Sequence, residues 1–276
     1  MKFKIVGDSC CDLTKEELKK DYFVSVPLTL TVGGVDVIDD ENFNQKKFLK
    51  MMEECPECPK SSCPSPEAFM EAFEGAEDVY VVTLSSKLSG SYNSAVLAKQ
   101  IYQEEHADVN IHVFDSKSAA AGEHLICGKL EECLLKGMGF DEVVSTVEEY
   151  IKGQRTIFVL ENLEVMRKNG RLTKLKSVVA NVLNIKPVLH EVDGEIHQID
   201  QARGMNKALN KLLWQIEKSD YDKNRRVEIT QCDSYERCMN VRKILIEKFG
   251  FKDVVILDAG GVSTMYENSG GVVVSF

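Results

Sequence analysis

The sequence lacks an excess of positive charge and any long apolar run. Its 34 Lys and Arg residues are outnumbered by 44 Asp and Glu residues, which gives a net charge of −10. Because phosphates would be repelled, this balance argues against a general binder of nucleic acid or of membrane surfaces. No stretch approaches the length of a transmembrane helix, and the apolar run near Met1 is far too short for a signal peptide. We therefore expect a cytoplasmic protein.

The sequence also lacks a complete metal or redox motif. Nine cysteines are many, but the number is odd and no export signal is present, so we expect reduced thiols. Cys55-Pro56-Glu57-Cys58, followed by Cys63, has the spacing of such a motif. However, no second CxxC and no well-spaced histidine pair completes a zinc site, and no strand precedes the motif as in thioredoxin-like proteins. We interpret it as the cysteine-rich end of a helix, without a metal.

A catalytic motif is missing as well. The serine-rich loops contain no Ser-His-Asp or Cys-His pattern, and of the five histidines only His124 lies close to a predicted strand end. We therefore expect a binding protein that catalyses no reaction and needs no cofactor. The alternative is an enzyme: a phosphotransferase or hydrolase that uses Ser89 or Cys63, or a thiol-redox protein that uses Cys55 and Cys58.

The first half of the sequence alternates strand and helix patterns. With 276 residues the chain is long enough for two modest domains or one large domain. Strand patterns at residues 3–7, 79–84 and 109–114 are followed by helical ones, which predicts a parallel α/β sheet. A capping box at Thr14 and Glu17 predicts a first helix. Residues 24–32 read as one further strand, with a return strand at 35–38.

The second half has a different pattern. An Asp193-Gly194 turn between residues 187–192 and 195–199 predicts a β-hairpin. An apolar helix at 175–183 and an amphipathic helix at 206–218, together with the hairpin and single strands, indicate a second α/β domain with a mixed sheet. We place the boundary near Gly153, with domains at 1–153 and 154–276.

Polar residues follow three of the predicted strands of the first half. They are Asp8-Ser9, the serine-rich loop at 85–89 and Asp115-Ser116. In an open parallel sheet this carboxyl edge is where ligands bind. The serine loop opens a helix, whose unpaired amide groups and positive dipole end favour an anion. Its spacing matches neither the phosphate-binding loop nor the dinucleotide fingerprint, so no nucleotide is implied. A plain strand-to-helix connection is the alternative interpretation.

Several segments together resemble one family, the DegV proteins, which bind fatty acids. The matching segments extend along the whole chain. They are DSCCDL at 8–13, SSCPSP at 61–66, LSSKLSGSYNSA at 84–95, Asp115-Ser116, residues 160–172 with Asn169-Gly170-Arg171, and the glycine-rich residues 260–276.

The resemblance implies a two-domain α/β fold with one fatty acid in a tunnel between the domains. In the family, hydroxyl groups from two serine or threonine motifs bind the carboxylate. By position these correspond to Ser61 and Ser89, with Ser86 as the alternative to Ser89. Arg171 matches an arginine of the family's Gly-Gly-Arg motif. The bound acid is presented to a fatty acid kinase, which converts it to an acyl phosphate for phospholipid synthesis.

The sequence departs from the family pattern at three positions near the expected head group. Cys63 stands where glutamine is common, and Ala120 stands where a small hydroxylated residue is common. Tyr266 occupies the place of a histidine that some members carry. A tyrosine hydroxyl can donate one hydrogen bond but carries no positive charge.

Two further expectations concern the acyl tail and the kinase. The tail needs apolar walls, for which residues 119–130 and 178–183 are candidates. Arg203 and Lys207, with Lys211, form a basic stripe that could dock the kinase. A solvated surface is the alternative interpretation of that stripe.

Overall fold

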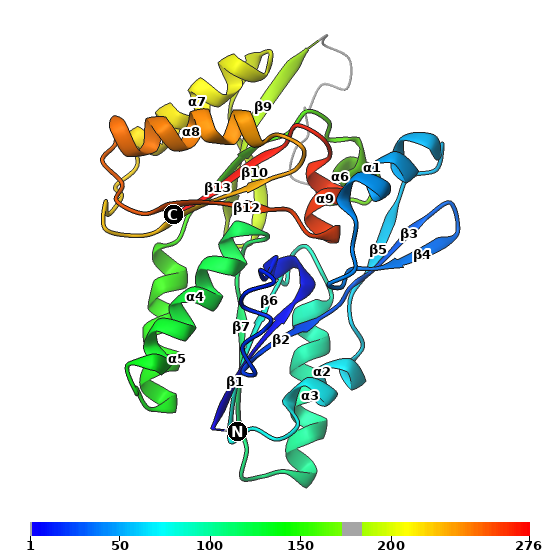
Figure 1. Ribbon diagram of the computed structural model, residues 1–276, viewed down its shortest axis with the longest axis vertical. Helices are drawn as coiled ribbons and strands as arrows, with labels where there is room; N and C mark the ends of the chain where they lie inside the picture. Colours follow the sequence, from blue (N-terminus) through cyan, green and yellow to red (C-terminus); the bar gives the residue numbers. More distant parts are fainter. Residues whose placement is uncertain (1, 173–183) are drawn as a thin grey trace.

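The computed structural model describes residues 2–172 and 184–276, and its first layer is a parallel sheet (Figure 1). Four parallel strands lie in the order β2-β1-β6-β7. Parallel pairing confirms the prediction for the first half. The bounds are β1 Phe3–Asp8, β2 Phe23–Val26, β6 Asp78–Thr83 and β7 Asn110–Asp115.

Side-chain alternation along these strands builds a core on each face of the sheet. Ile5 and Tyr80 point to one face, where they pack against α4 (Ala121–Leu135) and α5 (Phe140–Gly153). Their neighbours Val6 and Val81 point to the other face, which α2 (Pro66–Phe73) and α3 (Ser91–Glu105) cover. Both faces are therefore buried, as is typical of parallel sheets.

A small antiparallel sheet follows β2, and here the strand prediction was wrong. Residues 24–32 form two strands rather than one: β2 ends at Val26, and β3 (Thr29–Val32) belongs to a separate sheet with the order β4-β3-β5. Pro27 lies between them, and it has no amide N–H to continue a ladder. The expected return strand is β4 (Val35–Ile38), β5 covers Lys60–Ser62, and α1 (Gln45–Glu54) lies between these two.

The helix expected after Thr14 is absent from the structure, although its capping contacts are present. The Thr14 amide donates to Glu17 Oε2 at 2.8 Å, and the Glu17 amide donates to Thr14 Oγ1 at 3.3 Å. The backbone forms only turns from Lys15 to Lys19, because the chain must enter β2 at Phe23. The only helical element of this region is the short 3-10 turn η1 (Ser9–Cys11).

The second half forms a six-stranded mixed sheet, as predicted. The strand order is β10-β9-β8-β13-β11-β12, and only the β11–β12 pair is parallel. The Asp193-Gly194 turn joins β9 to β10 with φ values of 50° and 82°, which confirms the hairpin. The bounds are β8 Thr156–Val159, β9 Ile185–Val192, β10 Glu195–Arg203, β11 Val227–Gln231, β12 Val254–Asp258 and β13 Val272–Ser275.

The two faces of this mixed sheet have different neighbours. Ile157 and Val272 pack against α7 (Met205–Lys218) and α8 (Tyr235–Glu247), which cover the face away from the parallel sheet in Figure 1. Phe158 and Val273 point to the opposite face. Two short helices, α6 (Glu164–Lys168) and α9 (Gly261–Glu267), lie at one end of the sheet. The helix expected at 175–183 lies outside the described residues.

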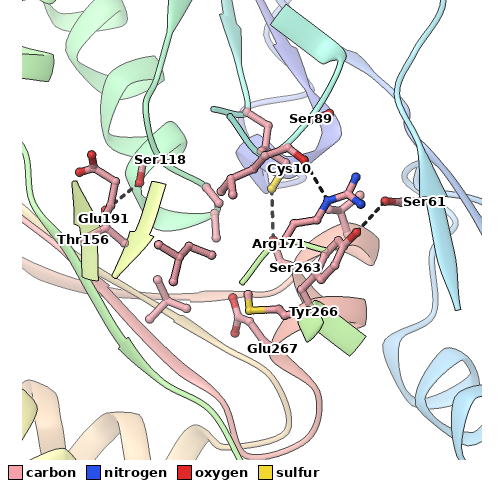
Figure 2. Close-up of a pocket in the computed structure, with 18 of the residues that line it drawn as sticks. Cys10, Ser61, Ser89, Ser118, Thr156, Arg171, Glu191, Ser263, Tyr266 and Glu267 are labelled. Carbon is pink, nitrogen blue, oxygen red and sulfur yellow. Dashed lines mark hydrogen bonds between the residues drawn. The ribbon is translucent and has the colours of Figure 1, made fainter. Parts of the chain in front are cut away.

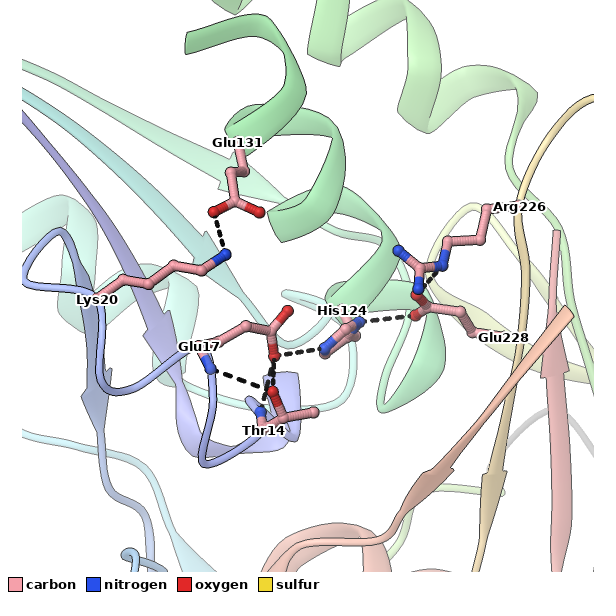
Figure 3. A network of polar contacts seen from close by, with 7 residues as sticks. All are labelled: Thr14, Glu17, Lys20, His124, Glu131, Arg226 and Glu228. Atoms are coloured by element: carbon pink, nitrogen blue, oxygen red, sulfur yellow. Dashed lines mark hydrogen bonds and ion pairs between the residues drawn. The ribbon is translucent and has the colours of Figure 1, made fainter. Parts of the chain in front are cut away.

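The two halves meet across a buried polar bridge, which Figure 3 shows. His124 on α4 is 3% exposed; its Nε2 lies 2.9 Å from Glu17 Oε2 and its Nδ1 lies 2.8 Å from Glu228 Oε2 on β11. Burial alone would lower the pKa of His124, but the charge of Glu228 and the hydrogen bonds of both carboxylates raise it well above the usual value. The charged His124 side chain on α4 of the first half is therefore bonded to Glu228 on β11 of the second half.

The strands divide between the sheets according to sequence. Every strand of the parallel sheet ends by Asp115, and every strand of the mixed sheet begins at or after Thr156. We propose domains at 1–153 and 154–276 on this basis. Within the described residues, no helix is long and apolar enough to cross a membrane.

Candidate functional site

The carboxyl edge of the parallel sheet brings the three predicted loops together. Asp8, at the end of β1, is fully buried; its Oδ2 accepts a 2.8 Å hydrogen bond from the Leu84 amide and another from the Ser91 hydroxyl. Asp115, at the end of β7, accepts from both the amide and the hydroxyl of Ser86. Two aspartate side chains, one on each strand that neighbours β6, thus hold the serine loop.

A second pair of aspartate side chains positions helix α9. Asp12 accepts from the Gly260 amide at 2.8 Å and from the Ser263 hydroxyl at 2.7 Å. Asp39 accepts from the amides of Gly261 and Val262 at 2.6 and 2.9 Å. These bonds satisfy first-turn amides that have no partner within the helix. Burial raises the pKa of Asp12 to about 8 and that of Asp39 to about 6.

Close approach explains the glycine that begins this helix. A Cβ atom at Gly261 would lie 2.6 Å from Asp39 Oδ1. Asp12 belongs to the DSCCDL segment, whereas we did not single out Asp39 from the sequence. Only the position of Asp39 directly after a strand could have indicated that it binds the start of α9, because the amides that it accepts from lie more than 200 residues away along the chain.

Between the two sheets lies a cavity of about 290 Å³ (Figure 2). Its walls are mainly apolar and come from both halves of the chain. Leu88 packs against both of the hydrophobic clusters that flank the cavity. The apolar lining includes Leu28, Leu84, Leu88, Phe158, Leu160, Met166, Ile196, Val262 and Val273. Of the candidate tail segments, Ala119 and Ala120 line the cavity, most of α4 packs in the core of the first half, and 178–183 lies outside the described residues.

Four of the five expected head-group residues line this cavity. Ser61 on β5 and Tyr266 on α9 place their hydroxyl oxygens 3.1 Å apart. Ser89 lines the cavity from the serine loop, and its Oγ accepts from the Ser91 amide at 3.2 Å. Figure 2 shows Arg171 beside them. The structure thus brings together residues that are more than 200 positions apart in the sequence.

Arg171 reaches from the second half of the chain to the serine loop. Its Nε donates to the Leu88 carbonyl at 3.1 Å, and its Nη1 donates to the Asn169 carbonyl. No carboxylate of the described residues forms an ion pair with this guanidinium. A positive charge without such a counterion faces a mainly apolar cavity, and this arrangement favours an anionic group on an apolar ligand.

The remaining expected residues lie elsewhere or differ in role. Ser86 is outside the cavity, because its hydroxyl donates to Asp115. Cys63 and Ala120, the two other departures from the family pattern, line the cavity. Gly90 directly precedes α3, and the Ser89 hydroxyl accepts from the amide of Ser91, the first residue of that helix. Arg203 and Lys207 are exposed, at the end of β10 and on α7, away from the cavity lining.

Other polar groups of the cavity were not found from the sequence. The hydroxyl oxygens of Ser118 and Thr156 lie 2.7 Å apart at the other side of the view in Figure 2, close to Glu191. Glu267 is 3% exposed, and neither carboxyl oxygen has a hydrogen-bond partner within the described ranges. Burial raises the pKa of Glu267 well above its usual value, which favours the neutral form of this side chain.

One buried cluster has the composition of a metal site. Among the described residues, Asp8, Cys11 and Glu123 have ligand atoms within 4.8 Å of one another. Asp8 already accepts bonds from amide and hydroxyl groups. Burial raises the pKa of all three groups, which favours their protonated forms over the anions that bind metals. We therefore assign the cluster a structural role.

Comparisons with known proteins identify relatives along the whole chain. A DegV family protein from Ruminococcus gnavus, solved with vaccenic acid, is 44% identical and has a TM-score of 0.95, with 99% of each chain covered. The Streptococcus pneumoniae Fatty Acid Kinase (Fak) B3 protein, loaded with linoleic acid, is 34% identical with a TM-score of 0.93, covering 100% of this chain and 99% of that one. A DegV domain-containing protein of S. pneumoniae is 35% identical, over 100% of this chain and 99% of its own length.

The family assignment also rests on a family model. The model described as "Uncharacterised protein, DegV family" matches residues 2–276. Because this match covers nearly the whole chain and the relatives above cover it as fully, the chain belongs to the DegV family.

Proposed function

We propose that this protein binds one long-chain fatty acid in the cavity and presents it to a fatty acid kinase. The observation that carries the proposal is the guanidinium of Arg171, which faces an apolar cavity beside two serine hydroxyls and has no carboxylate partner among the described residues. The fatty acids in the related structures support the same ligand class.

The head group is held by hydroxyl groups and one positive charge. A carboxylate removed from water costs several kcal/mol unless hydrogen bonds and charge compensate for it. Ser89 Oγ already accepts a bond from an amide, so its own proton can be donated to the ligand. The Ser61–Tyr266 pair supplies a second donor, since either hydroxyl can be the donor to the other. Ser86 is not proposed, because Asp115 takes its proton.

The apolar walls supply the affinity. Each buried methylene contributes about 0.8 kcal/mol, so a sixteen-carbon tail contributes on the order of 10 kcal/mol before the costs of binding. Phe158 and Val273 of the mixed sheet and Leu28 and Leu84 of the first half are placed to contact such a tail from opposite sides. The hydroxyls and Arg171 would then select an acid and fix its direction.

The kinase would dock outside the cavity. Arg203 and Lys207 are exposed cations on an acidic protein, and they suit a partner surface that is acidic or that handles nucleotide phosphates. This part of the proposal is supported by the name of the S. pneumoniae relative, which associates that protein with a fatty acid kinase. In this role the protein carries its ligand and catalyses no reaction.

Native mass spectrometry and lipid extraction of protein purified from cells test the proposal. We expect one long-chain acid per chain. After delipidation, Ser61→Ala combined with Ser89→Ala should weaken palmitate binding by about 2 kcal/mol or more. Ser86→Ala is the matched control, and it should leave the affinity unchanged because Ser86 lies outside the cavity. A protein that carries no acid and binds none when it is added would refute the proposal.

A further inference from the structure

The Cys55-Pro56-Glu57-Cys58 segment connects α1 to β5 and has no role in the proposed binding site. The backbone bends at Pro56 and Glu57, so the two cysteines flank a single bend. Both are free and half-buried, and both pack against the same apolar cluster. Both also line a groove of about 800 Å³ that lies outside the ligand cavity. The two cysteines therefore share one groove.

Cys58 is connected through its neighbours to two of the expected head-group residues, Arg171 and Ser61. Asn169 Nδ2 lies 3.7 Å from Cys58 Sγ, and it donates to the Pro59 carbonyl at 2.9 Å and to the Val165 carbonyl at 3.0 Å. The carbonyl oxygen of Asn169 accepts from the guanidinium of Arg171. On the other side, β5 begins at Lys60 and carries Ser61, which contacts Tyr266. The position of one thiol is thus linked to Arg171 and to Ser61.

We propose that Cys55 and Cys58 form a redox-regulated disulfide site whose oxidation weakens fatty acid binding. This inference rests on the proposed function. The Cys58 sulfur contacts Asn169 in the reduced form, and a bond to Cys55 would turn it away from that amide. Asn169 would lose a contact, and the segments that hold Arg171 and Ser61 would shift. Geometry at the head group is sensitive to such shifts, because hydrogen bonds weaken steeply with angle and distance.

The oxidant is a small-molecule disulfide such as oxidised glutathione. One cysteine thiolate attacks a sulfur of this disulfide, forms a mixed disulfide and releases the first small thiol. The other cysteine thiolate attacks the mixed disulfide at the protein sulfur, forms the Cys55–Cys58 bond and releases the second small thiol. The protein loses two electrons and two protons, and the small-molecule disulfide gains both, so the exchange balances.

The test measures the affinity of the full chain for radiolabelled palmitate in reduced and oxidised glutathione, with disulfides mapped by peptide mass spectrometry. In oxidised glutathione we expect a Cys55–Cys58 disulfide and an affinity for palmitate that is about tenfold weaker, as for the loss of one hydrogen bond to a charged group. Dithiothreitol should restore the affinity of the reduced protein. The double variant Cys55→Ser with Cys58→Ser should bind palmitate as the reduced protein does in either buffer. Asn169→Ala should still form the link but lose most of the difference in affinity.

The outcomes separate this inference from the proposed function. Absence of the Cys55–Cys58 link, or a link that leaves palmitate affinity unchanged, would overturn the redox inference alone. If the reduced protein binds no palmitate, both fail. A response that persists in the double cysteine variant would assign the effect to other thiols, such as the exposed Cys63, and would also overturn the inference.

Discussion

Replacement of His124 by asparagine tests the buried bridge between the two halves of the molecule. His124 contacts Glu17 and Glu228, and Glu228 has only Arg226, at 3.2 Å, as another ionic partner among the described residues. Burial alone would raise the pKa of Glu17, but the hydrogen bond and the charge of His124, together with the hydrogen bonds of the Thr14 hydroxyl and amide, lower it to about 2 from 4.5. The whole shift corresponds to about 3 kcal/mol of stability at neutral pH, and His124 supplies part of it. Removing one partner from a buried ion pair has a similar cost, roughly 3–5 kcal/mol.

Urea denaturation of wild type and His124→Asn at several pH values measures this contribution. The two titrating groups fix the pH window. The pKa of His124 is about 6.5 in the unfolded chain and higher in the folded protein. The stability that follows from this difference is fully present below about pH 6.5 and is lost as the pH rises through the folded pKa. The lowered pKa of Glu17 gives stability that is present above pH 4.5 and is lost as the pH falls through about 2. The difference between the two proteins should therefore be largest between these limits and smaller outside them.

A matched surface histidine provides the control. His112 lies 3.1 Å from Glu148, and both side chains are partly exposed. His112→Asn should therefore change the free energy of unfolding by less than about 1 kcal/mol. The reasoning would be refuted if His124→Asn cost less than about 1 kcal/mol near pH 6, or if its cost increased steadily towards alkaline pH.

Three further changes examine α9 and the basic surface. Asp39→Ala should lower the free energy of unfolding by about 2–3 kcal/mol, because it leaves buried amides at the start of α9 without an acceptor; a thermal denaturation curve like that of wild type would contradict this role. Tyr266→Phe should weaken fatty acid binding by about 1 kcal/mol in calorimetry with little change in stability, and unchanged affinity would exclude the hydroxyl from the head-group site. Arg203→Glu with Lys207→Glu should leave acid affinity unchanged but slow acyl phosphate formation by a fatty acid kinase. Lys243→Glu with Lys248→Glu, two exposed positions on α8 and at its C-terminal end, is the control for the same change of net charge, and equal rates in both variants would refute docking at the Arg203 and Lys207 surface.

Local patterns in the sequence determined the layers of the fold and the edge where the loops gather. Successive side chains along β1 and β6 point to opposite faces of the sheet, so neighbours such as Ile5 and Val6 belong to different cores. This alternation depends only on residues that are adjacent in the sequence. The Asp193-Gly194 turn needs two positive φ angles, which its residue types accept. Polar residues after parallel strands must meet at one edge, so Asp8 and Asp115 could be expected on either side of the serine loop.

Where the local signal was ambiguous, tertiary contacts decided the outcome. The capping box at Thr14 and Glu17 forms without a helix, because Glu17 also bonds to His124 and the chain turns back to enter β2. Residues 24–32 have strand propensity throughout, yet the two sides of Pro27 join different sheets. Propensity describes one segment at a time and cannot specify the sheet to which that segment belongs.

The binding site shows the same division between local and long-range information. The sequence by itself determined that a serine loop ends a buried strand and begins a helix, and it limited the candidate hydroxyls to a few. Only the tertiary structure decided that Asp115 takes the Ser86 hydroxyl while Ser89 faces the cavity. Only the tertiary structure placed Asp39 at the start of α9 and Tyr266 beside Ser61. The physical reason is that turns and faces follow from adjacent residues, whereas a hydrogen bond between segments 200 residues apart exists only after both sheets have packed.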